Sequence, residues 1–428
     1  AYEIRPRDWS SDVCSSDPRL GVWLGHADSD NLARSAPATE GYYDSLGLLL
    51  GLAKNSQRLT AHINSDLEYR SYSLNTLDNE TIGTLDAAAE VGIVPDRFMW
   101  TFRGNEGQGV RDPAAAFGPL NRQSISTIGS GPKLSLPLGG RMSFSLDGEY
   151  SKRRYDQSVY PDSDSVLYDV GLFRRTSQTG RIGIQASTDT IDFSGISAPS
   201  YKIDSVSVRY EKTLATGRVI AAVGNNRADT GVATSSNPLV NFEWTRAVAS
   251  RSTLSVNADR AFTDAGNELS VAPIVTTTNG AAAVALVASP IERQNVSVVY
   301  RLNGVRTSAD VSVGRFEDAY LTSSAFDNKG TALRVAVNHT ISMKLAFNVA
   351  WDRTERNMNN APGSPTYEEA TLSASVNRTL GRRFNVAGVI ARYERRGVAP
   401  VPDEHRYEIR FGYSPTQNAG APLGLMGR

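Results

Sequence analysis

The residues of this chain that could carry out acid–base, metal or nucleophilic chemistry are scattered along the sequence. The four histidines occur in separate segments without metal-ligand spacing: His26, His62, His339 and His405. The acidic segments ADSDN (Asp28, Asp30) and PDSDS (Asp162, Asp164) lack the full ligand register of a calcium loop. The Gly-Ser-Gly at 129–131 lacks the Lys-Ser/Thr of a phosphate loop, and no Ser/His/Asp grouping can be assigned. The sequence therefore predicts no catalytic, cofactor or metal site.

The single cysteine, Cys14, lies in the opening segment AYEIRPRDWSSDVCSSD, which has no apolar run of the kind a signal peptide needs. Back-translation of Asp8–Asp17 gives a DNA string that resembles a sequencing-library adaptor, and Ala1–Ile4 resembles its upstream part. A disordered arm is the alternative. We interpret residues 1–17 as translated adaptor and exclude them from fold reasoning. We then expect a cysteine-free protein whose signal peptide was lost by truncation, which excludes disulfides and cysteine nucleophiles.

Charged residues recur at alternate positions within amphipathic segments. In SVSVRYEKTLATGRVIAAVG, Val206 and Val208 alternate with Ser207 and Arg209. Successive side chains of a strand point to opposite faces, so such a segment has one apolar and one polar face. We predict that ten charged residues on the polar faces line a lumen: Asp147, Glu149, Arg209, Glu211, Asp259, Arg301, Asp310, Arg334, Asp352 and Arg410. That lumen would be wet or electrostatically cross-braced. The alternative is a plugged interior in which these residues only pack and nothing is transported.

The elements that would carry these residues are strands in a long meander. From Ser124 onward, alternating segments are joined by short turns such as ATG and LGR and by longer polar segments at 156–165, 225–238, 353–369 and 395–404. Fifteen strands follow Ser124, and five more precede it. An even count places both ends of the chain on the short-turn side.

Several features favour a membrane barrel over a soluble all-β repeat protein, which is the alternative. The strands read as ten to twelve residues, enough to span a bilayer when tilted, and closure removes exposed strand edges. Aromatic residues near strand ends suggest interfacial girdles: Tyr150, Tyr155, Trp244, Phe262, Phe316, Trp351, Tyr393 and Tyr413. We predict an all-β, antiparallel up-and-down transmembrane β-barrel of roughly 18–20 strands over residues 18–415, with short periplasmic turns, long extracellular loops and a tail at 416–428.

The chain has 45 basic and 45 acidic residues, so it lacks the excess of positive charge that is typical of nucleic-acid-binding proteins. The predicted partners are outer-membrane lipid and a polysaccharide or small solutes.

The chain also resembles the exosortase-associated (PEP-CTERM system) family of outer-membrane β-barrel proteins. The resemblance lies in GVWLGHADSDNLARS, with its Asp30–Leu32 loop, and in RDPAAAFGPLNRQSISTIGSGPKL, and it would extend from Leu20 to Pro415. It implies a bacterial outer membrane and a link to exopolysaccharide or surface-protein sorting, and it brings no catalytic residues.

Three functions remain open at this point. The first is a non-enzymatic channel or an export-associated barrel for sugars or polysaccharide. The second is a structural or adhesin-like protein that binds a partner through its long loops. The third is an outer-membrane hydrolase, which would need a catalytic cluster at one rim.

Overall fold

The computed structural model describes residues 18–415 except 113–114, 157–161, 195–199, 265–288, 323, 359–365 and 398–399. The adaptor interpretation of residues 1–17 and the tail at 416–428 lie outside the described residues. The described chain forms twenty strands and two short 3-10 helices, η2 (Pro119–Asn121) and η3 (Ser324–Phe326).

The first ten strands are β1 (Arg19–Ser29), β2 (Gly41–Asn55), β3 (Leu59–Tyr72), β4 (Glu80–Val94), β5 (Phe98–Val110), β6 (Arg122–Pro137), β7 (Met142–Tyr155), β8 (Ser163–Arg175), β9 (Gly180–Phe193) and β10 (Tyr201–Leu214). The second ten are β11 (Gly217–Asp229), β12 (Thr234–Ala249), β13 (Ser252–Thr263), β14 (Ile291–Asn303), β15 (Thr307–Tyr320), β16 (Asn328–Ser342), β17 (Leu345–Met358), β18 (Thr366–Leu380), β19 (Phe384–Gly397) and β20 (Val401–Tyr413).

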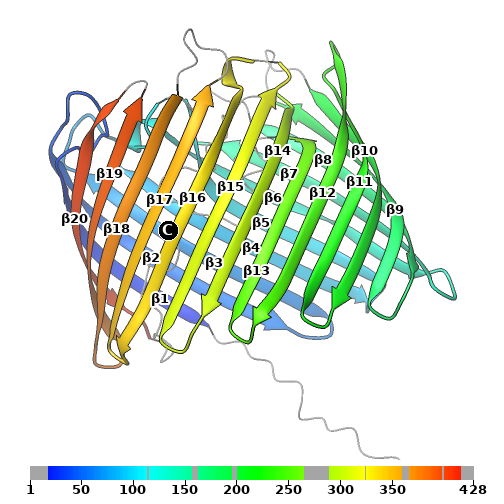
Figure 1. The fold of residues 1–428 in the computed structure, drawn as a ribbon, viewed down its shortest axis with the longest axis horizontal. Helices are drawn as coiled ribbons and strands as arrows, with labels where there is room; N and C mark the ends of the chain where they lie inside the picture. Colours follow the sequence, from blue (N-terminus) through cyan, green and yellow to red (C-terminus); the bar gives the residue numbers. More distant parts are fainter. Residues whose placement is uncertain are drawn as a thin grey trace, which may run out of the picture.

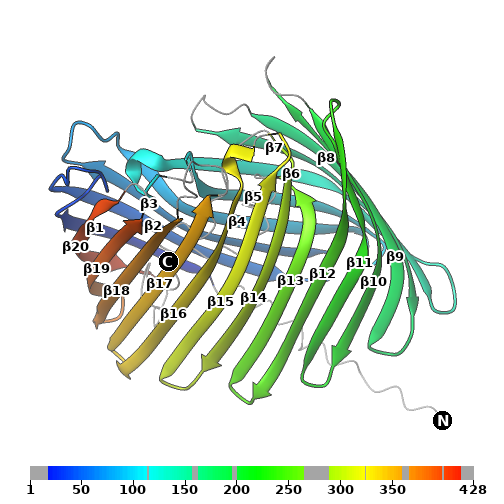
Figure 2. The same ribbon diagram turned by 45° about the horizontal axis from the view of Figure 1, so that its top comes forward.

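Each strand pairs antiparallel with the next one in the chain, and β1 pairs with β20, from Val22–Tyr413 to Ser29–Arg406. This closing pair turns the meander into a barrel, so the predicted antiparallel up-and-down transmembrane β-barrel is confirmed. Figure 1 shows the strands running obliquely around it, with β9 to β18 in front of the blue and cyan strands of the opposite wall. In Figure 2 the same barrel is turned so that its upper end comes forward.

The two ends of the barrel differ in their connections. Nine connections, from β2–β3 to β18–β19, contain two to four residues each and lie at the lower end in Figure 1. The other ten contain three to 27 residues. We call these ends the short-turn rim and the long-loop rim. The first residue of β1 and the last of β20 both lie at the short-turn rim, as the even strand number requires.

Two predictions about strand extent were wrong. The strands contain 11 to 16 residues instead of ten to twelve. The segments 225–238, 353–369 and 395–404, predicted as long loops, contribute most of their residues to the neighbouring strands, β11, β12 and β17 to β20. A 14-residue strand tilted by about 45° rises about 33 Å, slightly more than the hydrocarbon layer. Polar side chains beyond that layer face water on either side, so polarity there does not end the strand.

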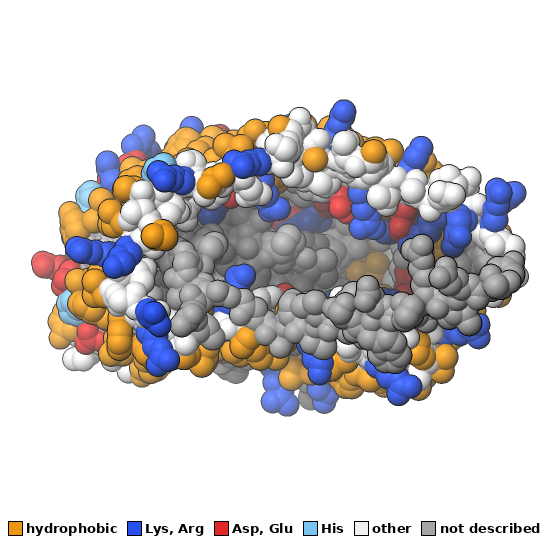
Figure 3. Space-filling model, turned by 90° about the horizontal axis from the view of Figure 1, so that it is seen from below, with side chains coloured by type: hydrophobic (Ala, Val, Ile, Leu, Met, Phe, Trp, Pro, Cys, Tyr) orange, Lys and Arg blue, Asp and Glu red, His pale blue; other side chains and the backbone are white. Residues whose placement is uncertain are grey.

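The strand register separates two faces with opposite chemistry. Directly paired residues share a face, and one face carries large exposed apolar side chains, among them Leu24, Ile128, Val208, Leu372 and Phe411. The other face carries charged and small side chains. Figure 3, a view along the barrel, shows an elongated hollow with acidic and basic side chains on its inner wall and apolar ones outside. The apolar face is therefore the outer belt, the surface that lipid covers in a membrane barrel.

The aromatic residues predicted as interfacial girdles divide between the two faces. Tyr150, Trp244, Trp351 and Tyr413 belong to the outer face. Tyr155, Phe316 and Tyr393 point inward, because each pairs with inner-face residues, and Phe262 is buried at the long-loop rim. Position near a strand end does not determine the face, since one residue of shift reverses it.

Candidate functional site

The candidate site is the inner wall of the barrel. Followed from strand to strand, the register places all ten predicted lumen residues on the inner face: Asp147, Glu149, Arg209, Glu211, Asp259, Arg301, Asp310, Arg334, Asp352 and Arg410. Their participation in solute passage stays a prediction.

Six of the ten form three mutual ion pairs. Arg209 Nε donates to Glu211 Oε1 at 2.7 Å along one strand. The other two pairs join neighbouring strands, Arg301 to Asp310 and Arg334 to Asp352, each with an N–O distance of 3.1 Å. Asp352 is buried, whereas the Arg301–Asp310 pair is exposed near the short-turn rim. The inner wall is thus braced by charge pairs that leave little net charge at these positions.

The remaining four residues have other surroundings. Glu149 accepts a hydrogen bond from Arg103, Arg410 donates to Glu408, and Asp259 accepts from Asn295 at 3.1 Å. Asp147 lies opposite Lys133 and Asp169 in the strand register. Within the described chain Asp147 forms no ion pair, because the Lys133 ammonium group lies 3.0 Å from Glu90 instead.

A buried network around Glu369 of β18 was missed by the sequence reasoning. Its carboxylate accepts hydrogen bonds from the Tyr393 hydroxyl at 2.8 Å and from Arg395. The Arg395 guanidinium lies 4.0 Å from the centre of the Tyr367 ring. The sequence alone could not show that these side chains meet, because they come from two strands and their contact depends on the strand register.

A second set of charged inner-face residues has a spacing that is visible in the sequence. Glu68 and Arg70 lie two residues apart on β3, like Glu408 and Arg410 on β20, and both pairs are buried. Residues at i and i+2 share a strand face. Arg410 was predicted from the sequence, and opposite charges at that spacing within an amphipathic segment could also have identified Glu68, Arg70 and Glu408.

The loop at 30–40 folds onto the inner wall at the long-loop rim. Arg34 Nε donates to Glu404 of β20 at 2.6 Å, and Arg34 Nη1 donates to the Phe117 carbonyl at 2.6 Å. The same guanidinium lies 4.0 Å from the centre of the Tyr393 ring. Leu32 is buried beside Tyr43. Arg34 therefore ties three separate segments together at the mouth of the barrel.

The end of β13 makes a second inward contact at the same rim. Its ladder with β12 stops at Val240–Arg260, so the last residues of β13 leave that neighbour. Phe262 donates its backbone N–H to the Asn226 side chain at 3.1 Å and packs against buried Ile203. Just beyond, Asp264 forms a buried ion pair with Arg153 of β7, with an N–O distance of 3.0 Å. These contacts join strands that are far apart around the barrel.

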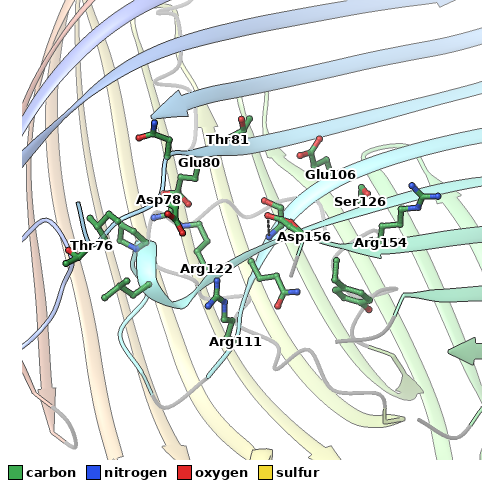
Figure 4. A pocket seen from close by; sticks show the side chains of 17 residues that line it. Thr76, Asp78, Glu80, Thr81, Glu106, Arg111, Arg122, Ser126, Arg154 and Asp156 are labelled. Carbon is green, nitrogen blue, oxygen red and sulfur yellow. Dashed lines mark hydrogen bonds and ion pairs between the residues drawn. The ribbon is translucent and has the colours of Figure 1, made fainter. Parts of the chain in front are cut away.

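A polar pocket of about 740 Å³ lies where β4 and β5 separate. Their ladder ends at Leu85–Glu106, although both strands continue toward the long-loop rim. Glu80 comes from the inner face, whereas Thr81 and Glu106 come from the outer face, so the pocket lies in the wall itself. Figure 4 shows the labelled side chains around it. The charged ones are Asp78, Glu80, Glu106, Arg111, Arg122, Arg154 and Asp156. This mixture of donors and acceptors suits a hydroxyl-rich solute.

The histidines do not gather at one place: His62 lies on the inner face of β3, whereas His26, His339 and His405 lie on the outer face. Three histidines contact carboxylates: His26 with Asp44, His62 with Asp86 and His405 with Asp30. His339 contacts the Thr307 hydroxyl. In the part of the chain that the structure describes, no group of three or more His, Cys, Asp or Glu side chains could hold a metal ion.

Among the described residues, no helix is long and apolar enough to cross a membrane.

No protein-family model and no curated protein matches the sequence. The structure is similar to solved structures at low identity. The siderophore receptor PirA from Pseudomonas aeruginosa is 10% identical over 93% of this chain and 80% of that chain, with a TM-score of 0.43. A mutant of the ferric enterobactin receptor PfeA from Pseudomonas aeruginosa is 7% identical over 94% and 81%, with a TM-score of 0.46. A BenF-like porin from Pseudomonas fluorescens Pf-5 is 10% identical over 93% and 99%, with a TM-score of 0.38. These likenesses concern the fold alone.

Proposed function

We propose that this protein is a non-enzymatic channel of a bacterial outer membrane that passes small polar solutes. The observation that carries the proposal is the hollow, closed barrel with an apolar outer belt and a charged inner wall. Closed barrels with polar interiors belong to outer membranes, and those of 16–18 strands already enclose an aqueous channel.

Sugars are the solutes that we propose. Charges on the inner wall are largely paired, and this disfavours strong selection for either anions or cations. The paired groups still offer hydrogen-bond donors and acceptors to the hydroxyl groups of a sugar. The pocket between β4 and β5 has the same mixed character at the long-loop rim. The link to exopolysaccharide export rests on the family resemblance of the sequence and is part of the proposal.

Conductance of single proteins in planar bilayers tests the channel, and Asp147 provides a site-specific variant. We expect stepwise conductance from the wild-type protein. In a water-filled lumen, a unit charge shifts the energy of an ion 4 Å away by about 1 kcal/mol. Asp147→Lys should therefore change the anion-to-cation permeability ratio roughly several-fold, measured as a shift in reversal potential under a salt gradient.

Asp164→Lys is the matched control, because Asp164 is exposed on the outer face of β8. It should leave the permeability ratio unchanged. A folded barrel without conductance would contradict the channel and favour binding through the long loops, which protease shaving on intact cells would then test. Equal effects of the two variants would show that the ions do not pass along the inner wall.

A further inference from the structure

The short-turn rim has an unusual charge composition. Its nine connections contain eight basic residues and one acidic residue, Asp96. The basic residues, which we call the basic rim, are Arg58, Arg97, Arg141, Arg251, Arg306, Lys344, Arg382 and Arg383.

The long-loop rim has the opposite composition. In the described residues of its ten connections, two are basic, Arg34 and Arg111. Eight are acidic: Asp30, Glu40, Asp78, Asp112, Asp156, Asp162, Asp264 and Asp327. The near-neutral total charge of the chain therefore conceals a strong separation of charge along the barrel axis.

The basic rim is exposed and lacks internal counterions. All eight side chains are exposed, and within the described residues none of them takes part in an ion pair. Arginine residues on the inner wall behave differently, since Arg209, Arg301 and Arg334 each have a carboxylate partner. The rim charges are thus available to an external anion.

Exposed apolar residues accompany these charges at the same turns. Met343 is 98% exposed next to Lys344, and Val305 is 78% exposed next to Arg306. Leu138 and Phe384 are each 57% exposed at the turns of Arg141 and Arg383. A side chain at a lipid interface places apolar atoms at the acyl boundary while a nearby guanidinium or ammonium group reaches the phosphate.

The distribution of the turns indicates the kind of partner. The basic residues occur in seven of the nine short connections, spread around the circumference instead of gathered on one side. A soluble protein docked on one side could reach only some of them. A lipid leaflet surrounds the whole rim, and the outer apolar belt leads directly to it, with Phe347 and Phe384 exposed at the strand ends.

We propose that the basic rim binds the anionic phospholipid headgroups of the leaflet at the short-turn end of the barrel. This proposal rests on the membrane location in the proposed function. Bound phosphates would neutralise the ring of charge and hold the barrel at a fixed depth. Attraction of this kind weakens with salt, because exposed charges are screened.

The test measures lipid selection by the folded full-length protein. The barrel is equilibrated in mixed micelles of phosphatidylglycerol and phosphatidylcholine, and the retained lipids are counted by native mass spectrometry. We expect the protein to enrich phosphatidylglycerol at least threefold over the bulk ratio at low salt, with the enrichment lost at high salt. Replacement of four rim residues, Arg306→Gln, Lys344→Gln, Arg382→Gln and Arg383→Gln, should reduce the enrichment to near one.

The control replaces four exposed basic residues far from this rim, Lys152→Gln, Arg154→Gln, Lys202→Gln and Arg227→Gln, and should keep the enrichment. Gel migration with and without boiling confirms that each barrel is folded. If the fourfold variant does not fold, the double variant Arg306→Gln and Lys344→Gln replaces it in the lipid measurement. No enrichment by the folded wild-type protein would overturn the lipid proposal without affecting the channel. Equal enrichment by the rim variant and the control would also overturn it.

Discussion

At the scale of single residues, the inner wall is stabilised by charges that are buried together with their partners. Glu369 is 5% exposed and accepts hydrogen bonds from Tyr393 and Arg395. Removing one partner from such a network leaves the other charge buried without compensation, which costs far more than loss of an exposed pair. The neighbouring Glu368 points outward and pairs with Arg353, both partly exposed.

We therefore predict that Glu369→Gln lowers the free energy of unfolding by about 3 kcal/mol, because the Arg395 charge loses its carboxylate. Glu368→Gln, the same chemical change one residue away, should lower it by about 1 kcal/mol or less. Urea unfolding of the lipid-inserted barrel, followed by tryptophan fluorescence, measures both. Equal losses would show that the inner network does not stabilise the barrel.

At the scale of strands, small residues on the inner face make room for large side chains from neighbouring strands. Trp23 of β1 lies over Gly47 of β2, its partner in the register, and a Cβ atom at Gly47 would overlap the indole ring. The Arg410 guanidinium lies 4.1 Å from the centre of the Trp23 ring. The β20–β1–β2 region thus depends on a glycine at this position.

Gly47→Val should displace Trp23 and destabilise the barrel by about 1–3 kcal/mol or more, the usual cost of overpacking. Gly107→Val is the comparison, because Gly107 is also an inner-face strand residue, and a Cβ atom added there would have no other atom within 4 Å. The temperature at which the unboiled gel form disappears should fall for Gly47→Val only. A similar fall for both would point to β-strand backbone effects instead of Trp23 packing.

At the scale of the whole molecule, closure between the first and last strands determines whether the sheet is a barrel. The eight residue pairs of β1 and β20 bring together segments nearly four hundred positions apart. Closure satisfies the backbone groups of both strands, which an open sheet would expose to lipid. The channel, the two rims and their opposite charges all depend on it.

A disulfide between β1 and β20 tests whether the barrel is closed. In a Cys14→Ser background, Leu24→Cys with Phe411→Cys should form an intramolecular disulfide on oxidation, because these residues are direct partners in the register. The measurement is the altered migration of the boiled, unreduced protein. Leu24→Cys with Leu372→Cys, both on the outer face and three strands apart, should not cross-link. Failure of the first pair in folded protein would argue against the β1–β20 contact.

Most of the strands could be predicted from the sequence, because alternation of side chains is a local property. The segment around Arg209 and Glu211 shows its two faces within a dozen residues. The same alternation identified the charged inner-face candidates. It did not predict where strands end beyond the bilayer, since β11 and β12 continue through polar residues that water can solvate on either side.

The sequence by itself determined the β class, the meander, the even strand number and the separation of apolar from charged faces, because these follow from alternation and turn length. Only the tertiary structure decided which charges meet. Arg153 and Asp264 are 111 positions apart, and Arg34 and Glu404 are 370 apart. Such contacts depend on register, on strand ends that turn inward and on closure, which are global properties. The charge difference between the rims was present in the sequence, but it became visible only when the barrel gathered every second turn at one end.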